Sequence, residues 1–269
     1  MTFGRRLALT CVAWSAALLM AAPILWVAIT AFKTDADALQ FPPTLLFWPT
    51  LENFASANSN VSVARPLLNS IVESFGATAL CFAFALPAAY GLAFGPHRGR
   101  NAILLGFLMT RFMPAIGLMI PMYLIFAAAG LLDTRLGLVL IYALTNLPIV
   151  IWMLYAYMRE IPRDILDGAK IDGASANQQL VLVLMPLCGP GICSTALLSV
   201  IFCWNEAFWS IQMTSSTAAP LSAYIATLSG DLLWAKLSAA SMLAVAPILL
   251  LGWLTQRQFV RGLTFGAVR

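Results

Sequence analysis

Long apolar runs, separated by short polar connections, dominate the sequence. The runs have the length of helices rather than of strands, and each is long enough to cross a hydrocarbon core of about 30 Å, which takes about 20 residues at the helical rise. Membrane-spanning helices are predicted at residues 7–31, 67–93, 102–130, 136–158, 180–210 and 236–257. The pattern therefore predicts an all-α integral membrane protein with six spans.

Prolines interrupt these runs at several points. Membrane helices tolerate such interruptions where neighbouring helices satisfy the freed backbone groups, so the spans are expected to form a packed bundle. The prolines within the runs are Pro23, Pro87, Pro114, Pro121, Pro148, Pro186, Pro190 and Pro247.

The composition also indicates a membrane protein. Apolar residues make up 61% of the chain and charged residues only 10%, against about 25% charged residues in an ordinary soluble domain. A soluble protein would need more polar surface than 15 Lys and Arg, 11 Asp and Glu and one His can supply. Disordered chains are poor in apolar residues. Both of those classes are excluded.

Basic residues in the connections predict the orientation. With the N-terminus inside, the inner connections hold ten Lys and Arg residues and the outer connections four. Because cytoplasmic loops carry the excess of Lys and Arg, both termini are expected in the cytoplasm. The net charge of +4 is then largely a topology signal, and without a basic patch no nucleic-acid partner is expected. The first run is longer than the core of a signal peptide and is expected to remain as a span.

Residue patterns typical of catalytic or metal sites are missing from the sequence. The five cysteines lie inside apolar runs, form no C-x-x-C pair and are expected to be small buried residues. His97 is the single histidine, and there is no Ser/His/Asp or H-E-x-x-H arrangement. No catalytic residue and no metal site is predicted, which argues against an intramembrane enzyme.

The inner connection at residues 159–179 differs from the others in its charge. Seven of the chain's 26 charged residues fall within 14 positions there. Pro162 suits the first turn of a helix and Asp164 suits its positive end, while charged residues recur at i, i+4 and i+7 on one face. A short amphipathic helix that ends near Asp172-Gly173 is predicted.

This helix would lie at the cytoplasmic surface. A helix of about nine residues covers only about 14 Å, which is too short to cross a membrane. Ser175, followed three residues later by Gln178, is a capping-box signal that starts the next helix, which runs into the fifth span. The short helix is either a solvated, charged loop element or a docking element for a soluble partner.

The same connection resembles the cytoplasmic motif of binding-protein-dependent ABC importer permeases, E-A-A-x3-G-x9-I-x-L-P. The chain has Asp167–Ala169, then Gly173 after three residues, then nine residues before Val183–Pro186, so the spacing matches throughout. Asp172–Ala174 fits the D-G-A form of the carbohydrate branch. The departures from the motif are Asp167 for Glu, Gly168 for the first Ala, Val183 for Ile and Met185 for Leu. A glycine in place of alanine is expected to weaken the helix by about 0.5–1 kcal/mol.

Other parts of the chain carry the same resemblance. Thr134–Leu138, Trp204–Glu206 and the tail Arg261–Val268 are similar to the second permease subunit of maltose-type sugar importers. The stretch from Ala219 through Ser238 and on to the tail is most similar to the members that transport sorbitol and mannitol. The resemblance covers nearly the whole chain.

The resemblance implies a six-span type I ABC importer fold and a coupling role for the surface helix. In the family, this helix inserts into a cleft on the ATPase subunit and transmits its opening and closing to the spans. The residues that take this role are Asp167, Gly168, Ala169, Asp172, Gly173, Ala174 and Pro186. The expected division is 1–66 for the first span and outer loop, 67–258 for the five-span core permease domain, and 259–269 for a cytoplasmic tail. In maltose-type relatives such a tail reaches into the ATPase dimer.

The resemblance also implies the partners and the location. They are a homologous permease subunit, an ATPase dimer and a periplasmic sugar-binding protein, assembled in the bilayer of the bacterial inner membrane. The chain lacks a G-x-x-x-x-G-K-[ST] phosphate loop, so ATP and magnesium are expected on the ATPase and no cofactor on this chain.

The expected substrate is a sugar or sugar alcohol, with sorbitol or mannitol favoured and a disaccharide as the alternative. The rival function is an ion-gradient-driven secondary transporter, which would want paired intramembrane carboxylates and inverted repeats. Only Glu73 and Glu206 qualify as such carboxylates, and they lie in no repeated context.

Charged residues inside the spans are candidates for the transport path, because a charge at the centre of a membrane helix costs at least about 2.5–3.5 kcal/mol and must face a partner or water. Arg111 lies near the midplane of the third span, and Glu73 lies in the outer part of the second. They either pair with each other or line a cavity that binds sugar hydroxyls. Asn205 and Glu206, near the outer end of the fifth span, either line the outward cavity, contact the binding protein or form hydrogen bonds between helices.

Overall fold

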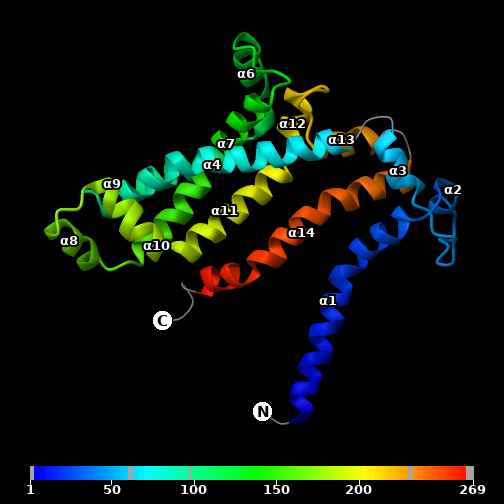
Figure 1. Cartoon of the computed structure of the whole chain (residues 1–269), viewed down its shortest axis with the longest axis horizontal. Coiled ribbons are helices and arrows are strands. Elements are labelled where there is room, and N and C mark those ends of the chain that lie inside the picture. Colours follow the sequence, from blue (N-terminus) through cyan, green and yellow to red (C-terminus); the bar gives the residue numbers. More distant parts are fainter. Residues whose placement is uncertain (1–2, 60–62, 97–98, 230–232, 265–269) are drawn as a thin grey trace. The chain divides into compact units, whose positions relative to one another are not determined.

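In the computed structural model of the chain, all regular secondary structure of the described part is helical (Figure 1). The residues that the structure describes are 3–59, 63–96, 99–229 and 233–264. The chain falls into two compact units, Met1–Arg65 with Tyr224–Pro247 and Pro66–Ala223 with Ile248–Arg269. The predicted all-α class is confirmed.

Four long helices correspond to four of the predicted spans. They are α1 (Phe3–Ala31), α4 (Ala64–Phe94), α7 (Arg135–Arg159) and α14 (Trp234–Thr264). Each contains a window that is long and apolar enough to cross a membrane. The ends of α1, α4 and α7 lie close to the predicted ones, because apolar length sets the extent of a membrane helix, whereas α14 continues to Thr264, beyond the predicted end at residue 257.

The third and fifth predicted spans are not straight helices. The third consists of α5 (Arg100–Arg111) and α6 (Ala115–Ala128), and the fifth consists of a segment at 176–187 followed by α11 (Gly189–Trp204). Each pair is bent by 86°. With each bent pair counted as one span, the described residues contain six spans, but two predicted continuous runs are corrected to broken ones.

Prolines account for both bends. Pro114 has ψ 122° and stands in extended backbone just before α6, and a proline disfavours helical backbone at the residue before it. In the fifth span Pro186 and Pro190 provide no N–H for the carbonyl four residues earlier. The segment there is α9 (Ala176–Gln178), the π-helix η1 (Gln179–Leu184) and α10 (Met185–Leu187).

The remaining helices are short and lie in the connections. They are α2 (Asp35–Ala38), α3 (Glu52–Ser59), α8 (Arg163–Ile171), α12 (Phe208–Met213) and α13 (Leu221–Ser229).

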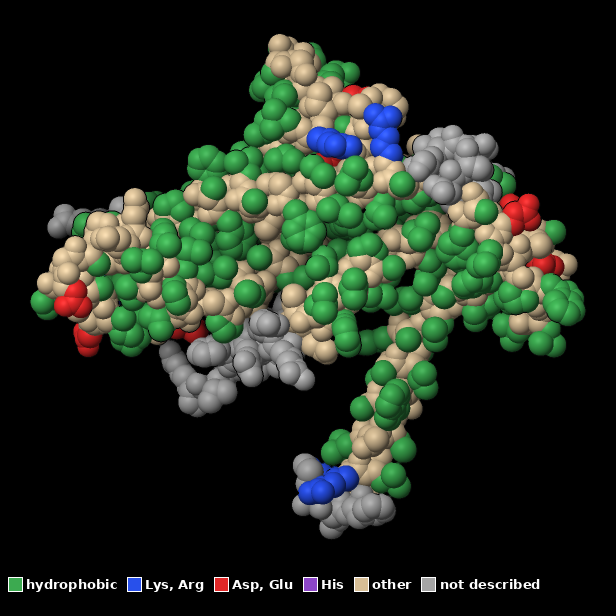
Figure 2. Space-filling view, viewed as in Figure 1, with side chains coloured by type: hydrophobic (Ala, Val, Ile, Leu, Met, Phe, Trp, Pro, Cys, Tyr) green, Lys and Arg blue, Asp and Glu red, His purple; other side chains and the backbone are tan. Residues whose placement is uncertain are grey.

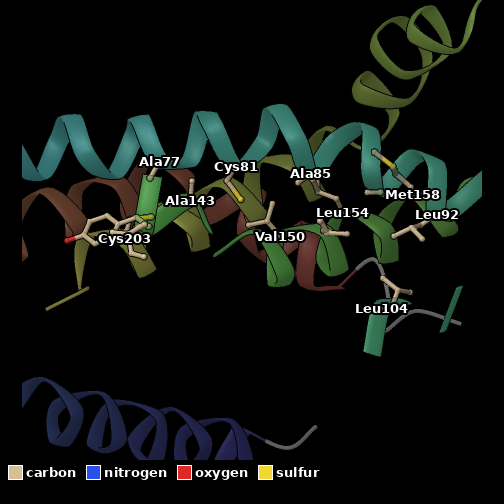
Figure 3. Close-up of a cluster of buried hydrophobic side chains, with 14 of the residues drawn as sticks. Ala77, Cys81, Ala85, Leu92, Leu104, Ala143, Val150, Leu154, Met158 and Cys203 are labelled. Carbon is tan, nitrogen blue, oxygen red and sulfur yellow. The ribbon is translucent and has the colours of Figure 1, made fainter. Parts of the chain in front are cut away.

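The core of the second unit is built from α4, α7 and α11. On α4 the residues Ala77, Cys81, Ala85 and Ala89 recur every four positions and are almost fully buried. Small residues let helix backbones approach closely, which is a main source of packing energy in a membrane. Figure 3 shows Ala77, Cys81 and Ala85 of α4 in one buried cluster with side chains of α7 such as Leu154, and Ala89 belongs to the same cluster.

Polar side chains also join the helices of this core. Thr78 donates to the Ser199 hydroxyl at 3.1 Å, which links α4 to α11. The Asn146 amide contacts the Cys203 sulfur at 3.3 Å, which links α7 to α11. Such interhelical hydrogen bonds hold neighbouring spans together in lipid.

The expected burial of all five cysteines is wrong for two of them. Cys81, Cys188 and Cys203 are buried, whereas Cys11 and Cys193 are exposed on the surface of the chain. An apolar run predicts a membrane helix but does not tell which of its faces points away from the bundle.

Gly191 sets the approach of α11 to α7. A Cβ atom at this position would overlap the ring of Tyr157. Gly191→Ala is therefore expected to lower the free energy of unfolding by about 1–3 kcal/mol, as overpacking of a tight contact does. Gly189→Ala is the matched control, because a Cβ there meets no atom within 4 Å. Thermal unfolding of the detergent-solubilised variants measures both, and equal melting temperatures would refute the close contact.

In the first unit, Lys33 folds the connection after α1 back on itself. Its side chain is 1% exposed, donates to the Thr44 carbonyl at 2.6 Å and lies over the rings of Trp26 and Phe47 at 5.0 and 5.3 Å. The Asn53 amide donates to the carbonyl of Lys33 at 2.6 Å. Cation–π contacts and a carbonyl partner thus compensate for the burial of an ammonium group.

Candidate functional site

The charged inner connection forms the predicted surface helix. Helix α8 spans nine residues, Arg163–Ile171, with Pro162 at its N-cap and Asp172 at its C-cap. Leu166 is 2% exposed and anchors one face, while Asp167 and Lys170 form an exposed ion pair at 3.2 Å. The helix runs through Gly168 without a break, so the glycine does not shorten it.

A tight turn ends α8 and depends on a glycine. Gly173 has φ +85°, in the left-handed region that side chains with a Cβ rarely adopt. The N–H of Gly173 donates to the Lys170 carbonyl at 3.0 Å, and the N–H of Ala174 donates to the Ala169 carbonyl at 2.9 Å. This pair of bonds is a Schellman motif, which satisfies the last carbonyls of the helix.

The predicted capping box starts the next helix. The Ser175 N–H donates to Oε1 of Gln178 at 2.8 Å, and the Gln178 N–H donates to Oγ of Ser175 at 3.4 Å. Helix α9 begins at Ala176 and continues through η1 into the fifth span. The chain therefore passes from α8 into this span through one defined turn.

Two surface hollows flank α8 and separate the predicted coupling residues into groups. One, of about 310 Å³, is lined by Ala169, Asp172, Gly173, Ala174, Gln178, Leu182 and Val183. The other, of about 290 Å³, is lined by Tyr90, Gly91, Phe94, Gly95, Pro96, Arg163, Leu166, Asp167, Lys170 and Gln179. Gly168 and Pro186 line neither hollow. Figure 2 shows acidic side chains around α8 and hydrophobic side chains over much of the visible surface.

Arg111 stands where the third span breaks. It is the last residue of α5, and its exposed side chain donates to the Thr145 carbonyl at 2.7 Å. Its guanidinium lies 5.4 Å from the centre of the Phe202 ring. Arg111 thus reaches from α5 to α7 and α11.

Glu73 is not the partner of Arg111 in the described part of the chain. Its side chain on α4 is 0% exposed, and neither carboxyl oxygen has a hydrogen-bond partner among the described residues. One turn away on α4, the side-chain Oδ1 of Asn69 accepts from Nε of Arg135 at 2.8 Å. Arg111 and Glu73 were expected either to pair with each other or to line a cavity, and in this structure they do not pair.

Glu206 and Asn205 hold the outer end of α11. The Glu206 carboxylate accepts from the Trp209 N–H in the first turn of α12 at 3.2 Å. The Glu206 carbonyl accepts from the hydroxyls of Tyr142 at 3.3 Å and Ser222 at 2.8 Å. Asn205 is exposed, and its amide donates to the Ile201 carbonyl at 2.9 Å. The four path candidates are therefore not brought into direct contact with one another by any hydrogen bond or ion pair of the described residues.

Asp133 is a residue that the sequence analysis missed. It lies between α6 and α7 with φ +53°, which Asp tolerates better than most residues. Its carboxylate accepts from the backbone N–H groups of residues 215–218 at 3.1–3.4 Å and from the Ser215 hydroxyl at 3.0 Å. The Asn69 amide donates to the carbonyls of Thr217 and Ala219 at 3.1 and 3.0 Å. Together these side chains fix the connection between α12 and α13.

The Asp133 site is expected to depend on charge. Burial acts to raise the pKa of Asp133, but hydrogen bonds from Ala218, Thr217 and Ser215 outweigh it and hold the pKa well below its usual range. Because the folded pKa is lowered, the stabilisation is fully present above the unfolded pKa of about 3.9 and is lost as pH falls through the folded value.

Asp133→Asn keeps the shape of the side chain and removes its charge. The variant is expected to lose about 1–2 kcal/mol of stability at pH 7, because the site is partly open to solvent. The difference in melting temperature from the parent should be the same at pH 7 and pH 5, since both lie above the unfolded pKa. Asp37→Asn, at a half-buried position on α2, is the control. A difference that shrinks between pH 7 and pH 5 contradicts the assignment.

Comparison with known proteins identifies the family. Residues 82–264 match the family described as binding-protein-dependent transport system inner membrane component. The chain belongs to this family. The matched residues include α8, the Schellman turn and the bent fifth span, so the region that carries the motif lies within the family's common part.

Individual relatives cover nearly the whole permease. It is 32% identical over 257 residues to the trehalose transport system permease protein SugB of Mycobacterium tuberculosis, with 92% of each chain covered. It is 30% identical over 249 residues to the probable ABC transporter permease protein y4oR of Sinorhizobium fredii, with 92% of this chain and 90% of that protein covered. The predicted relationship to carbohydrate ABC importer permeases is confirmed.

The fold is shared with a solved transporter. The crystal structure of a bacterial ABC transporter involved in the import of the acidic polysaccharide alginate superposes with a TM-score of 0.78 at 21% identity. The match covers 96% of this permease and 99% of that chain. The predicted ABC importer transmembrane fold is confirmed, and the permease is a multi-pass protein of the inner membrane.

Proposed function

We propose that the permease translocates a sugar or sugar alcohol into the cell by alternating access, with sorbitol or mannitol as the favoured substrates. The family membership, the trehalose permease among its relatives and the similarity of Ala219–Ser238 to polyol permeases support the proposal. A disaccharide is the second candidate, because the trehalose relative is similar over 92% of its length.

Energy would come from ATP hydrolysis on a separate ATPase dimer that holds ATP and magnesium. The chain lacks a phosphate loop, so the permease would need a surface that binds the ATPase and transmits its conformational change to the spans. The observation that carries this proposal is α8, a surface helix anchored by Leu166 and ended by the Gly173 turn, with the family's spacing. Asp167, Gly168, Ala169, Asp172, Gly173, Ala174 and Pro186 are the proposed coupling residues.

The physical requirement for such coupling is a bundle with two states, biased by ligands at two separate places. ATP binding would draw the coupling helices of this chain and of a homologous permease subunit together. A periplasmic binding protein would deliver the substrate at the outer face. The proposed division of the chain is 1–66, 67–258 and a tail at 259–269 that reaches the ATPase; residues 265–269 of the tail lie outside the described residues.

Arg111, Glu73, Asn205 and Glu206 are proposed to line the transport path at different stages. Arg111 and Asn205 are exposed and accessible in this conformation. Glu73 is fully buried, so it would meet substrate only after the spans rearrange. Burying a polar group without a partner inside the membrane costs free energy, so such a group is a candidate for a functional site.

Uptake of labelled sorbitol, mannitol, trehalose and maltose tests the substrate. Cells with the genes for the permease and its partners are compared with cells that lack them, and the expected result is uptake of the polyols that needs ATP. If only a disaccharide is taken up, the substrate is the second candidate, a disaccharide, and not a polyol. Uptake that survives depletion of ATP but stops with a collapsed ion gradient would overturn the ABC mechanism in favour of a secondary transporter.

A further inference from the structure

Gln179 occupies an unusual position at the inner face of the second unit. It is the first residue of the π-helix η1, and its side chain is only 3% exposed although it is polar. Its neighbour Gln178 is exposed and belongs to the capping box of α9. Short π-helical turns are rare and often occur at functional sites.

The Gln179 side chain joins two elements that are far apart in sequence. Its Oε1 accepts from the Tyr90 hydroxyl at 3.0 Å, and Tyr90 lies near the inner end of α4. Its Nε2 donates to the Ala174 carbonyl at 2.8 Å, in the turn that ends α8. One buried amide therefore connects the second span to the turn of the coupling helix.

Only a side chain with both a donor and an acceptor makes this pair of bonds. A carboxylate at position 179 would keep the bond from Tyr90 but would face the Ala174 carbonyl without a proton to donate. An apolar side chain would make neither bond and would leave the Tyr90 hydroxyl and the Ala174 carbonyl without this partner at a partly buried site. The presence of glutamine at position 179 is therefore explained by its two hydrogen bonds and not by its burial.

We propose that Gln179 is a positioning residue through which the movement of α8 reaches α4. The inference rests on the proposed function, in which α8 follows the ATPase. Helix α8 then acts on two spans, on the fifth through the continuous chain and on the second through the Gln179 amide. Helix α4 is continuous from Ala64 to Phe94 and carries Glu73 in its outer half, so the bridge gives the ATPase a route to that buried carboxyl.

The experiment uses the complete transporter in proteoliposomes, with its ATPase and its loaded binding protein. Three variants are compared with the parent: Gln179→Glu, which removes the donor; Tyr90→Phe, which removes the other bond and keeps the ring; and Gln178→Glu as the matched control. A glutamate at position 178 still accepts from the Ser175 N–H, so the control makes the same chemical change at a site that does not need a donor. The readout is the amount of sugar imported per ATP hydrolysed, together with the amount of ATPase bound.

The expected result is loss of coupling without loss of assembly. Gln179→Glu and Tyr90→Phe should bind the normal amount of ATPase and hydrolyse ATP, while sugar imported per ATP falls about fivefold or more, the factor expected for one lost hydrogen bond in the equilibrium between states. Gln178→Glu should keep the parent ratio. The double variant of Tyr90 and Gln179 should be no worse than the poorer single variant, because both act through one bridge.

Two outcomes overturn the proposal. If Tyr90→Phe and Gln179→Glu both keep the parent ratio, α4 does not receive movement through this bridge. If both instead lose bound ATPase together with all activity, Gln179 only supports the fold of the inner face. Failure of the proposed function looks different: Gly173→Val would then leave ATPase binding and uptake unchanged, whatever the Gln179 variants do.

Discussion

Replacing Gly173 by valine is expected to leave the permease in the membrane and to detach or uncouple its ATPase. Gly173 has φ +85°, and a residue with a Cβ costs about 1–2 kcal/mol in that region, which corresponds to about a tenfold shift in population. The Schellman bonds to the Lys170 and Ala169 carbonyls would open, and the end of α8 would lose its defined shape. Uptake is expected to fall about tenfold or more.

Two further variants separate strain from coupling. Gly99→Val introduces a similar strain, since Gly99 has φ +83° and a Cβ there meets no atom within 4 Å, but it lies at the start of α5. It should retain bound ATPase. Gly173→Asn should retain most of the uptake, because Asn is tolerated at this cap position. Co-purification of the ATPase and uptake are measured for all three, and normal values for Gly173→Val would remove the case for docking through α8.

Replacing Arg111 by alanine is expected to abolish uptake or to change its substrate preference while assembly is retained. The side chain is exposed at the break between α5 and α6, so its loss leaves no cavity in the core. If its guanidinium binds sugar hydroxyls, the loss of hydrogen bonds to a charged group should reduce uptake about 10-fold to 100-fold.

The controls for Arg111 test its structural contacts. Phe202→Leu removes the ring under the guanidinium and keeps the charge, so its effect on uptake should be small. Arg111→Lys keeps the charge but not the planar fork, so uptake should lie between the parent and the alanine variant. If Arg111→Ala fails to insert or to assemble, the hydrogen bond to Thr145 and the cation–π contact with Phe202 are structural, and Arg111 is no longer a candidate for the transport path.

The elements that sequence predicted well are those defined by neighbouring residues. Helix α8, its end at Asp172 and the capping box at Ser175 depend on side chains within a few positions of the bonds they make. The four straight spans depend on apolar length alone. Proline positions were visible in the sequence too, but whether a helix continues through a proline or breaks at it depends on what packs around it. Helices α4 and α7 continue through Pro87 and Pro148, whereas the third span breaks at Pro114.

The sequence did not predict which side chains contact each other across long distances along the chain. Arg111 and Glu73 were the obvious charges to pair, yet Arg111 contacts Thr145 and Phe202, and Glu73 has no hydrogen-bond partner in the described part of the protein. Asp133 and Gln179 had no signal that distinguished them from other polar residues in connections. Their bonds reach residues 82–85 and 89 positions away, as in the Asp133 site and the Tyr90 bond.

The sequence by itself determined the membrane class, the surface helix α8 and the family, and it predicted the orientation, because apolar length, the count of basic residues and cap spacing act locally along the chain. Only the tertiary structure decided which buried polar groups meet. In lipid a polar side chain must find its partner on another helix, and that partner is chosen by how the bent spans pack. The bridge from α8 through Gln179 to α4 is therefore visible only in the folded protein.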